Sequence, residues 1–316
     1  MAELLFAPME GITSRTFREV HASFFSGVDR YYTPFLAPTQ VHKLTPVQLR
    51  EFGPGVLGPA RVVPQLLTKS VEDFLWAADA LGELGYGEIN LNLGCPSGTV
   101  VAKGKGAGML RDPDALARFL DGIFAASPLP LSVKTRLGLE QPSEFGLILE
   151  VLARYPWTLL ILHPRTRKQF YTGEICRTAF DRTYAEYSGR LCYNGDLRLP
   201  RQIREQNAAY PRADVMIGRG LLADPALAEK LHGGSLDRTR LLAFHETLCR
   251  AYLDRMHPNQ AVLPKMKELW THLILSFADD GTMLRRLCKA KKWEEFYGLT
   301  QIVLEELPLL LEARIS

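Results

Sequence analysis

A cysteine lies where an apolar run of the sequence ends in a turn. Cys95 follows the alternating residues 90–94 and precedes Pro96, and Asn92 lies three residues before it. Apolar alternation is typical of a buried strand, and Gly-Cys-Pro is typical of the turn that ends one. The pattern therefore predicts a thiol on a loop at the mouth of a strand, where it could donate a proton if it stays protonated. A small buried cysteine without chemistry is the alternative.

Other apolar runs also end in polar residues that could do chemistry. Lys134 is the hardest to explain as structure, because a lysine within a buried strand needs an anionic or accepting partner. A cofactor with a phosphate and an electron-accepting ring would supply that partner. His163 could equally be a hydrogen-bonded core histidine. The further candidates at these ends are Pro8, Met9, Gln65, Asn92, Arg136, Arg165, Asn194, Asp196 and the turn Gly218-Arg219-Gly220.

Two glycine turns could bind a phosphate. Asn194-Gly195-Asp196 and Gly218-Arg219-Gly220 each follow an apolar run and offer close backbone approach, and the second adds a guanidinium. Such groups hold a phosphate monoester dianion. Each tripeptide alone also fits a tight turn, in which Asn194 and Asp196 only cap the next element. No carboxylate pair, Ser-His-Asp order or metal-ligand spacing stands out, so no metal site is expected.

Strand-like runs alternate with helical segments through most of the chain. The runs cover residues 4–9, 30–34, 61–67, 88–92, 131–135, 159–163, 191–196 and 214–220. This alternation predicts a parallel sheet covered by helices, and eight units suit a (β/α)₈ TIM barrel over residues 1–236. The C-terminal ends of the strands build the active site in such barrels, which would bring the polar residues together. The proline- and glycine-rich stretch 35–60 predicts a long loop.

The last part of the chain predicts helices only. After His232-Gly233-Gly234-Ser235, helical patterns cover about 241–256, 264–277, 282–290 and 293–304, so we expect a small all-α helical-bundle domain at 237–316. A basic run beside Trp293 fits phosphate contact plus stacking on RNA. A solvated helix face is the alternative. The run consists of Arg285, Arg286, Lys289, Lys291 and Lys292, and Lys103, Lys105, Arg165, Arg167 and Lys168 could continue a basic track toward the active site.

Composition sets the broad class. The chain has 316 residues, of which 47% are hydrophobic, so a sizeable core is expected and global disorder is excluded. A net charge of +3 is compatible with nucleic acid but too mild to argue for it alone. Five cysteines without a CxxC pair fit a reducing cytoplasm, and we expect neither a signal peptide nor a membrane span. No obligate protein partner is evident.

The motifs resemble those of the tRNA-dihydrouridine synthases, in that family's order across residues 1 to about 230. They are Ala7-Pro8-Met9-Glu10-Gly11, Asn92-Leu93-Gly94-Cys95-Pro96-Ser97, Ser132-Val133-Lys134-Thr135-Arg136-Leu137-Gly138, His163-Pro164-Arg165-Thr166, Asn194-Gly195-Asp196 and Met216-Ile217-Gly218-Arg219-Gly220. The helical tail also resembles the family's RNA-binding domain.

The resemblance implies an FMN barrel that reduces uridine in tRNA with NADPH. Cys95 would give a proton to C5 of uracil while the flavin N5 gives hydride to C6. Asn92 and Arg136 would help to hold the flipped base. This role requires that no strong cation beside Cys95 favours the thiolate. FMN would lie on Ala7, Pro8, Met9, Gln65, Lys134, His163, Asn194, Gly195, Asp196, Gly218 and Arg219, and tRNA would meet Arg165, Arg285, Arg286 and Lys289.

Two other functions remain open. A flavin barrel oxidoreductase acting on a small molecule would share the FMN signals, and a non-catalytic RNA-binding relative would share the fold. Flavin absorbance separates the second from the other two.

Overall fold

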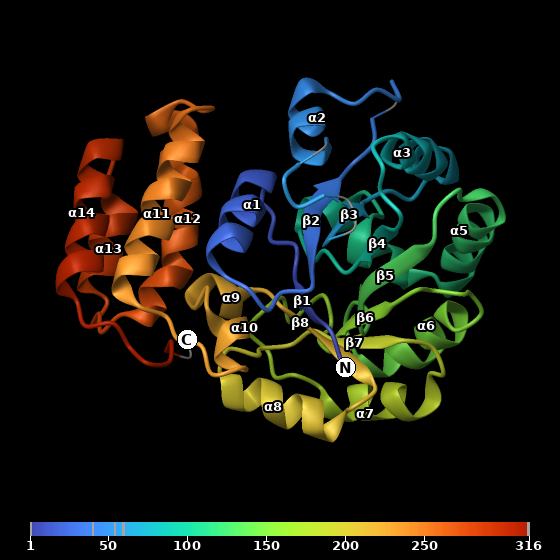
Figure 1. The fold of residues 1–316 in the computed structure, drawn as a ribbon. Coiled ribbons are helices and arrows are strands. Elements are labelled where there is room, and N and C mark those ends of the chain that lie inside the picture. The colour runs from blue at the N-terminus through green and yellow to red at the C-terminus, as the bar shows by residue number, and fades with distance from the viewer. Residues whose placement is uncertain (1, 40, 54, 59–60, 315–316) are drawn as a thin grey trace. The chain divides into compact units, whose positions relative to one another are not determined.

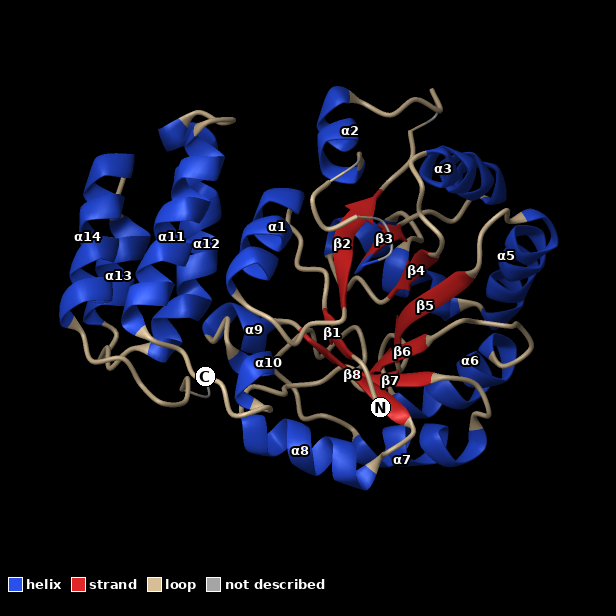
Figure 2. Ribbon diagram, in the orientation of Figure 1, coloured by secondary structure: helices blue, strands red, loops and turns tan. Residues whose placement is uncertain are grey.

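Eight parallel strands form a closed barrel in chain order (Figures 1 and 2). The computed structural model describes residues 2–39, 41–53, 55–58 and 61–314. The predicted (β/α)₈ barrel is confirmed, and every predicted strand coincides with an observed one. The strands are β1 (Leu4–Phe6), β2 (Arg30–Leu36), β3 (Val62–Leu66), β4 (Ile89–Leu93), β5 (Leu131–Arg136), β6 (Leu160–His163), β7 (Leu191–Tyr193) and β8 (Ala213–Ile217).

Three strands end earlier than the apolar pattern suggests. β1 stops before Pro8, which lacks a backbone donor, and β7 and β8 stop before their glycine turns. Residues 7–9, 194–196 and 218–220 therefore lie beyond the strand ends, where they are available to a site.

The chain forms two compact units, which we describe separately. The barrel unit comprises the described residues of 1–8, 30–195 and 207–216, and the helical unit those of 9–29, 196–206 and 217–316. The helices of the barrel unit are α2 (Pro46–Phe52), α3 (Val71–Glu83), α4 (Gly98–Ala102), α5 (Pro113–Ala126), α6 (Phe145–Leu152) and α7 (Arg177–Glu186). The 3₁₀ segments η2 (Gly106–Arg111) and η3 (Pro142–Glu144) also belong to it. α8 (Pro200–Ala209) connects β7 to β8.

The barrel helices begin at strong local signals. The Ser70 side chain accepts a hydrogen bond from the Asp73 amide at 3.2 Å at the start of α3. Asp112 accepts from the Ala115 amide at 2.9 Å, and Pro113 occupies the first position of α5. Such caps satisfy backbone donors that a helix start leaves unpaired.

The predicted loop over 35–60 is wrong in part, because it contains the helix α2. Residues 40, 54, 59 and 60 lie outside the described residues. Thr45 and Gln48 form a reciprocal capping box, and Pro46 stands at the first helical position. This short-range signal outweighs the surrounding prolines and glycines.

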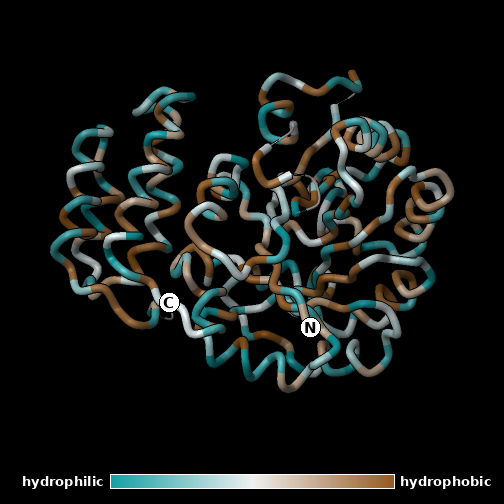
Figure 3. The backbone as a smooth tube through the Cα atoms, in the orientation of Figure 1, coloured by the Kyte–Doolittle hydropathy of each residue, from teal (hydrophilic) through white to brown (hydrophobic). Residues whose placement is uncertain are grey.

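Apolar side chains fill the centre of the barrel. Because side chains alternate along a strand, every second residue points inward. Figure 3 shows hydrophobic colour along the central strands and mixed colour along the helices around them. One buried cluster draws on six strands or the residues beside them: Leu5, Ala7, Tyr32, Val63, Leu159, Ile161, Cys192 and Met216.

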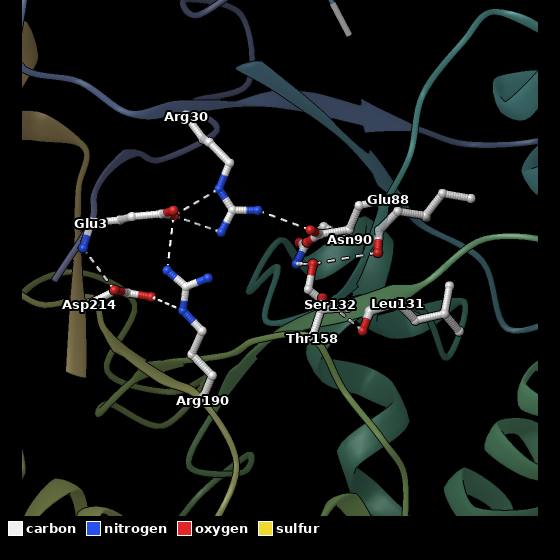
Figure 4. A network of polar contacts seen from close by, with 10 residues as sticks. Glu3, Arg30, Glu88, Asn90, Leu131, Ser132, Thr158, Arg190 and Asp214 are labelled. Atoms are coloured by element: carbon white, nitrogen blue, oxygen red, sulfur yellow. Dashed lines mark hydrogen bonds and ion pairs between the residues drawn. The ribbon is translucent and has the colours of Figure 1, made fainter. Parts of the chain in front are cut away.

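Paired charges occupy the N-terminal end of the barrel (Figure 4). The Glu3 carboxylate lies 2.9 Å from Arg30 and 3.0 Å from Arg190. Arg30 also contacts Glu88 at 2.9 Å, and Arg190 contacts Asp214 at 2.7 Å. Each of these residues precedes a strand or lies in its first two positions, so the network ties the strand starts together.

The helical unit holds the four helices predicted between 241 and 304, which are confirmed, and several shorter ones. Phe244 of α11 (Arg238–Leu253) packs edge-on against Phe17 of α1 (Arg15–Phe24) and against Phe25, with ring centroids 6.2 and 5.2 Å apart. In all described ranges, no helix has both the length and the apolar character that crossing a membrane requires. The elements are α1 (Arg15–Phe24), α9 (Arg219–Ala223), α10 (Leu227–Lys230), α11 (Arg238–Leu253), the π-helix η4 (Pro258–Val262), α12 (Leu263–Leu273), η5 (Ile274–Ser276), α13 (Thr282–Lys289) and α14 (Trp293–Glu306).

Candidate active site

Polar side chains gather inside the barrel toward the C-terminal ends of β3 to β6. Ser132, Lys134 and Arg136 occupy alternate positions of β5 and share one face. In the parallel register Asn92 of β4 pairs with Lys134, and Arg136 pairs with His163 of β6. The strand pairing therefore brings together candidates that are up to 71 residues apart in the sequence.

Asn92 positions the turn that carries Cys95. Its side-chain Oδ1 accepts hydrogen bonds from the amides of Gly94 at 3.0 Å and Cys95 at 2.9 Å. Because a backbone N–H can only donate, this atom must be the oxygen, and Nδ2 must then be the donor to Gln65 Oε1 at 2.7 Å. The resemblance implies that Asn92 holds a base, which stays a prediction; the bonds that it makes here orient Cys95.

The same chain of hydrogen bonds continues toward the N-terminal ends of the strands. Gln65 Nε2 donates to Asn90 Oδ1 at 2.7 Å, and Asn90 Nδ2 donates to Ser132 Oγ at 3.0 Å. All four side chains are buried. We call Asn92, Gln65, Asn90 and Ser132 the amide chain. Since Asn92 is oriented by backbone donors, the direction of every amide after it follows.

The glycine-rich stretch after Cys95 packs against that residue. Gly106 has φ +57°, and a Cβ there would lie 3.0 Å from the Cys95 Cβ. The Ala107 amide donates to the Cys95 carbonyl at 3.2 Å. Glycine is thus required by backbone shape and close approach. Cys95 itself is half-buried and, like the other four cysteines, forms no disulfide among the described residues.

Lys134 has no hydrogen-bond or ion-pair partner in the described part of the chain. Burial, with a smaller effect of the Arg136 charge, lowers its pKa to about 7, although Cys192 and Cys95 act in the opposite direction. A buried cation without an anion is costly, so the position is suited to a group that the protein itself does not supply.

The proposed role of Cys95 requires that no strong cation lie beside its thiol, but two cationic side chains are near it. Cys95 raises the pKa of both Lys134 and Arg136, so both cations lie within electrostatic reach of the thiol. With a pKa of about 7, however, Lys134 is mostly neutral in mildly alkaline solution. The Arg136 guanidinium is in turn engaged with backbone carbonyls, which moderates its pull on the sulfur.

Arg136 clamps three loop carbonyls. Its Nε donates to the Gly94 carbonyl at 2.8 Å, and its Nη1 donates to Thr166 at 3.0 Å and Phe170 at 2.6 Å. The guanidinium also lies 5.1 Å from the Tyr171 ring centroid. The side chain is only 2% exposed. It joins the Cys95 turn to the loop after β6; its predicted contact with the base stays a prediction.

His163 and Arg165 contact each other at the end of β6. Arg165 Nη1 lies 3.2 Å from His163 Nε2. Because a guanidinium only donates, Nε2 accepts and the ring proton belongs on Nδ1. Arg165 is 3% exposed and also donates to the Gly173 carbonyl, so it is buried in its own loop. Its predicted role in the basic RNA track is not supported by this position.

The remaining barrel candidates lie past β1 and β7. Ala7 is buried and Pro8 half-buried beyond β1. Asn194 Nδ2 donates to the Met216 carbonyl at 2.8 Å and so links the ends of β7 and β8. Gly195 follows directly. These residues follow the observed ends of β1 and β7, which lie earlier than the sequence pattern predicts.

In the helical unit, Met9, Asp196, Gly218 and Arg219 follow strand ends. Asp196 has a positive φ of 42° and pairs with Arg219 at 2.5 Å. A Cβ at Gly220 would clash with the Leu197 carbonyl, so glycine is required for the close approach of these two loops. The pairing shows that Arg219 already has one anion.

Sequence reasoning missed two residues of this unit, Arg198 and His272. Arg198 is 6% exposed. Burial, with smaller effects of the Arg219 and Arg198 charges, lowers the pKa of His272 to about 4. Arg198 could have been noticed two residues after the glycine turn, whereas His272 on α12 gives no sequence signal. Two guanidinium groups, Arg198 and Arg219, therefore lie within electrostatic reach of His272, which is neutral at pH 7 with a pKa of about 4.

The predicted RNA residues of the tail are exposed, but their aromatic neighbour is not. Arg285, Arg286 and Lys289 lie on the outer face of α13, and Trp293 is 7% exposed. The stacking role suggested for Trp293 is therefore wrong, because its ring packs into the unit beside Phe296 and Tyr297.

Exposed aromatic residues occur instead on the loop after β6, where sequence reasoning did not place them. Phe170 is 42% and Tyr171 46% exposed. The Tyr171 ring lies 6.1 Å from the His163 ring. Among the described residues, no group of three or more His, Cys, Asp or Glu could hold a metal ion.

Comparison with known sequences identifies related proteins. The profile of a family described as "Dihydrouridine synthase (Dus)" matches residues 5–295. A tRNA-dihydrouridine(16) synthase of Cupriavidus necator is 31% identical over 241 residues, which cover 74% of each chain. A probable tRNA-dihydrouridine synthase of Staphylococcus aureus is 30% identical over 78% of this chain and 77% of that protein. One of Rhodobacter capsulatus is 28% identical over 70% and 68%.

Solved structures share the barrel at much lower identity. Morphinone reductase in complex with tetrahydroNAD aligns with a TM-score of 0.53 and 13% identity, over 74% of this chain and 88% of its own. The old yellow enzyme from Trypanosoma cruzi aligns with a TM-score of 0.53 and 11% identity, over 81% and 95%. At these identities the likeness shows the fold alone.

Proposed function

Because the chain belongs to the dihydrouridine synthase family, and is therefore an oxidoreductase, we propose that it reduces specific uridines of tRNA to 5,6-dihydrouridine. The observation that carries the proposal is the geometry around Cys95. Asn92 and Arg136 hold both sides of its turn, and Lys134 lies close by without a protein partner.

The donor set fits a flavin mononucleotide. Lys134 is a largely buried cation that needs an acceptor, and a cation near the N1–C2 edge of a flavin favours its reduced anion. In the helical unit, the guanidinium groups of Arg219 and Arg198 would offer positive charge to a phosphate, and His272 would be a neutral neighbour. In this proposal FMN is held by Ala7, Pro8, Met9, Gln65, Lys134, His163, Asn194, Gly195, Asp196, Gly218 and Arg219.

When held by these residues, FMN would supply the hydride for C6 of the uracil ring, with NADPH as the reductant. Cys95 Sγ gives a proton to C5, where hydride addition leaves charge. Asn92 and Arg136 keep the thiol in place for that transfer. The half-buried position of Cys95 requires that the uridine leave its stack to reach the sulfur.

The partner in this proposal is tRNA, and the compartment is the cytoplasm, where the five cysteines without disulfides would be stable. Exposed Arg285, Arg286 and Lys289 would contact its backbone. Relatives from Cupriavidus necator and Ralstonia nicotianae are named tRNA-dihydrouridine(16) synthase, so position 16 is the first to examine.

A dihydrouridine map of tRNA from cells with and without the gene tests the reaction. We expect dihydrouridine to disappear at one position and to return when the purified protein, which should show the absorbance of a bound flavin, acts on that tRNA with NADPH. An unchanged map in a strain that also lacks related enzymes, together with flavin-bound protein, would favour a small-molecule reductase. Absence of flavin would favour a non-catalytic RNA-binding relative.

A further inference from the structure

Phe170 is an aromatic residue in a conformation that aromatic residues rarely adopt. It lies on the loop after β6 with φ 48°, in the left-handed region, and remains 42% exposed. Glycine or asparagine would take this backbone shape more easily. Strained residues of this kind cluster at functional sites, where the surroundings hold them in place.

The surroundings of Phe170 belong to the candidate active site. Its carbonyl accepts from buried Arg136, and its amide donates to the Arg167 carbonyl at 3.1 Å. The Arg167 guanidinium lies over the Phe170 ring, 5.2 Å from its centroid. Arg167 Nε also donates to the Pro96 carbonyl at 3.2 Å, in the turn that carries Cys95. The exposed ring is therefore connected to the Cys95 turn through Arg167.

Positive charge gathers on the glycine-rich stretch that packs against Cys95. Gly106 packs on Cys95, and Lys103 and Lys105 stand just before it. A Cβ at Gly104, between the two lysines, would lie 3.5 Å from the Lys69 ammonium nitrogen. Lys69, Lys103 and Lys105 form no ion pair within the described ranges. We call these three residues the lysine cluster.

We propose that Phe170, backed by Arg167, stacks the base of a nucleotide next to the target uridine, and that the lysine cluster binds the adjoining backbone phosphates. The inference rests on the proposed function. A single-stranded nucleotide matches both features, since every base has a face for stacking and every linkage carries a charge. Flipping one uridine unstacks its neighbour, and a ring held beside Cys95 offers that neighbour a new surface.

Binding of unmodified tRNA to Phe170 variants tests the stacking surface. We expect Phe170→Leu to raise Kd roughly 5- to 100-fold, since base–aromatic stacking has about that effect. Phe170→Trp should bind within about threefold of the wild type, because it keeps an aromatic face. Leu147→Ala is the matched control: Leu147 is 61% exposed on α6, outside the loop. Its Kd should not change.

Phe170→Gly separates stacking from a merely structural role. Glycine relieves the left-handed backbone, so the melting temperature should stay equal or rise, while Kd for tRNA rises as for Phe170→Leu. A loss of both stability and binding in Phe170→Gly would mean that the ring serves packing, and would overturn the proposal.

The salt dependence of binding tests the lysine cluster. Replacing Lys103 and Lys105 together by Gln should lower the slope of log K against log salt by about 0.7 per lost phosphate contact. Arg118→Gln, at an exposed position of α5, should leave the slope unchanged. An unchanged slope in the double variant would remove the lysine cluster from the proposal.

The two proposals fail in different ways. If the wild type makes dihydrouridine in tRNA and Phe170→Leu binds with an unaltered Kd, the stacking site is wrong and the proposed function stands. If the wild type neither binds nor modifies tRNA, both are wrong. Competition by a polyglutamate peptide as strong as that by tRNA would assign the surface to acidic protein instead.

Discussion

Glu3, Arg30 and Arg190 at the N-terminal end of the barrel each have an oppositely charged neighbour within 3.0 Å, whereas Lys134 toward the C-terminal end has none among the described residues. Both regions belong to one unit. The difference is that the first satisfies its charges within the protein, and the second leaves a charge for a bound group. The barrel thus separates stability from chemistry along its axis, as such folds do.

The largest expected effect is on chemistry at the C-terminal end. Cys95→Ala should lower the rate of dihydrouridine formation about 10²- to 10⁴-fold, the usual contribution of a positioned proton donor. Its urea midpoint should stay close to that of the wild type, since Cys95 is only half-buried. Cys288→Ala, at an exposed position, is the control for cysteine loss. Undiminished turnover in Cys95→Ala would remove it as the proton donor.

The next effect concerns stability at the N-terminal end. Arg30→Ala leaves Glu3 and Glu88 without their shared partner and should lower the free energy of unfolding by about 2–4 kcal/mol. The rate per folded molecule should not change. Arg182→Ala breaks an exposed pair with Glu186 on α7 and should cost less than about 0.5 kcal/mol. A fall in the rate per folded molecule of Arg30→Ala would contradict the conclusion that the N-terminal end serves stability alone.

A smaller effect should distinguish the hydrogen bonds that the Asn92 side chain accepts from the one that it donates. Asn92→Ala loses the acceptor for the Cys95 turn and should slow turnover about tenfold through misplacement of the thiol. Asn92→Asp keeps that acceptor and loses only the donor to Gln65. Single-turnover rates should therefore fall in the order wild type, Asn92→Asp, Asn92→Ala. Equal rates for the two variants would mean that the turn does not depend on the acceptor.

The smallest expected effect is a pH dependence of stability. Burial lowers the pKa of Lys134 to about 7, below its ordinary value of 10.5, so between these values the unfolded chain binds more protons than the folded one. The stability of the flavin-free wild type should then rise relative to Lys134→Met by roughly 1–2 kcal/mol from pH 7 to pH 9, and the difference should be flat below pH 7. Denaturant titrations at several pH values measure it. A parallel course of the two proteins would show that Lys134 has a charged partner after all.

The strands and the position of Cys95 could be predicted because they depend on local patterns. Alternation over five residues marks a strand, and a Gly-Cys-Pro turn marks its end. α2 was missed although its signal was also local: Thr45 and Gln48 bracket Pro46 in a capping box. Composition over a longer window obscured it.

The partners inside the site could not be predicted. Arg136 donates to the backbone carbonyls of Thr166 and Phe170, which are 30 and 34 residues away. The side-chain types of these two residues do not predict hydrogen bonds to their carbonyl groups. The neighbouring residues in the sequence also do not show whether a side chain is exposed or buried. Trp293 lies beside a basic run and is nevertheless buried. Backbone carbonyls and helix faces are determined by tertiary packing, which a single sequence does not display.

The amide chain has a consequence for how this barrel evolves. Its hydrogen bonds are all donated in one direction, from the Cys95 turn to Ser132, because backbone donors orient Asn92 at one end. A change at any member reverses or removes a donor for the next, so single substitutions strand a buried polar atom. Related proteins should therefore keep all four residues or change them together. The positions expected to co-vary are Asn92, Gln65, Asn90 and Ser132.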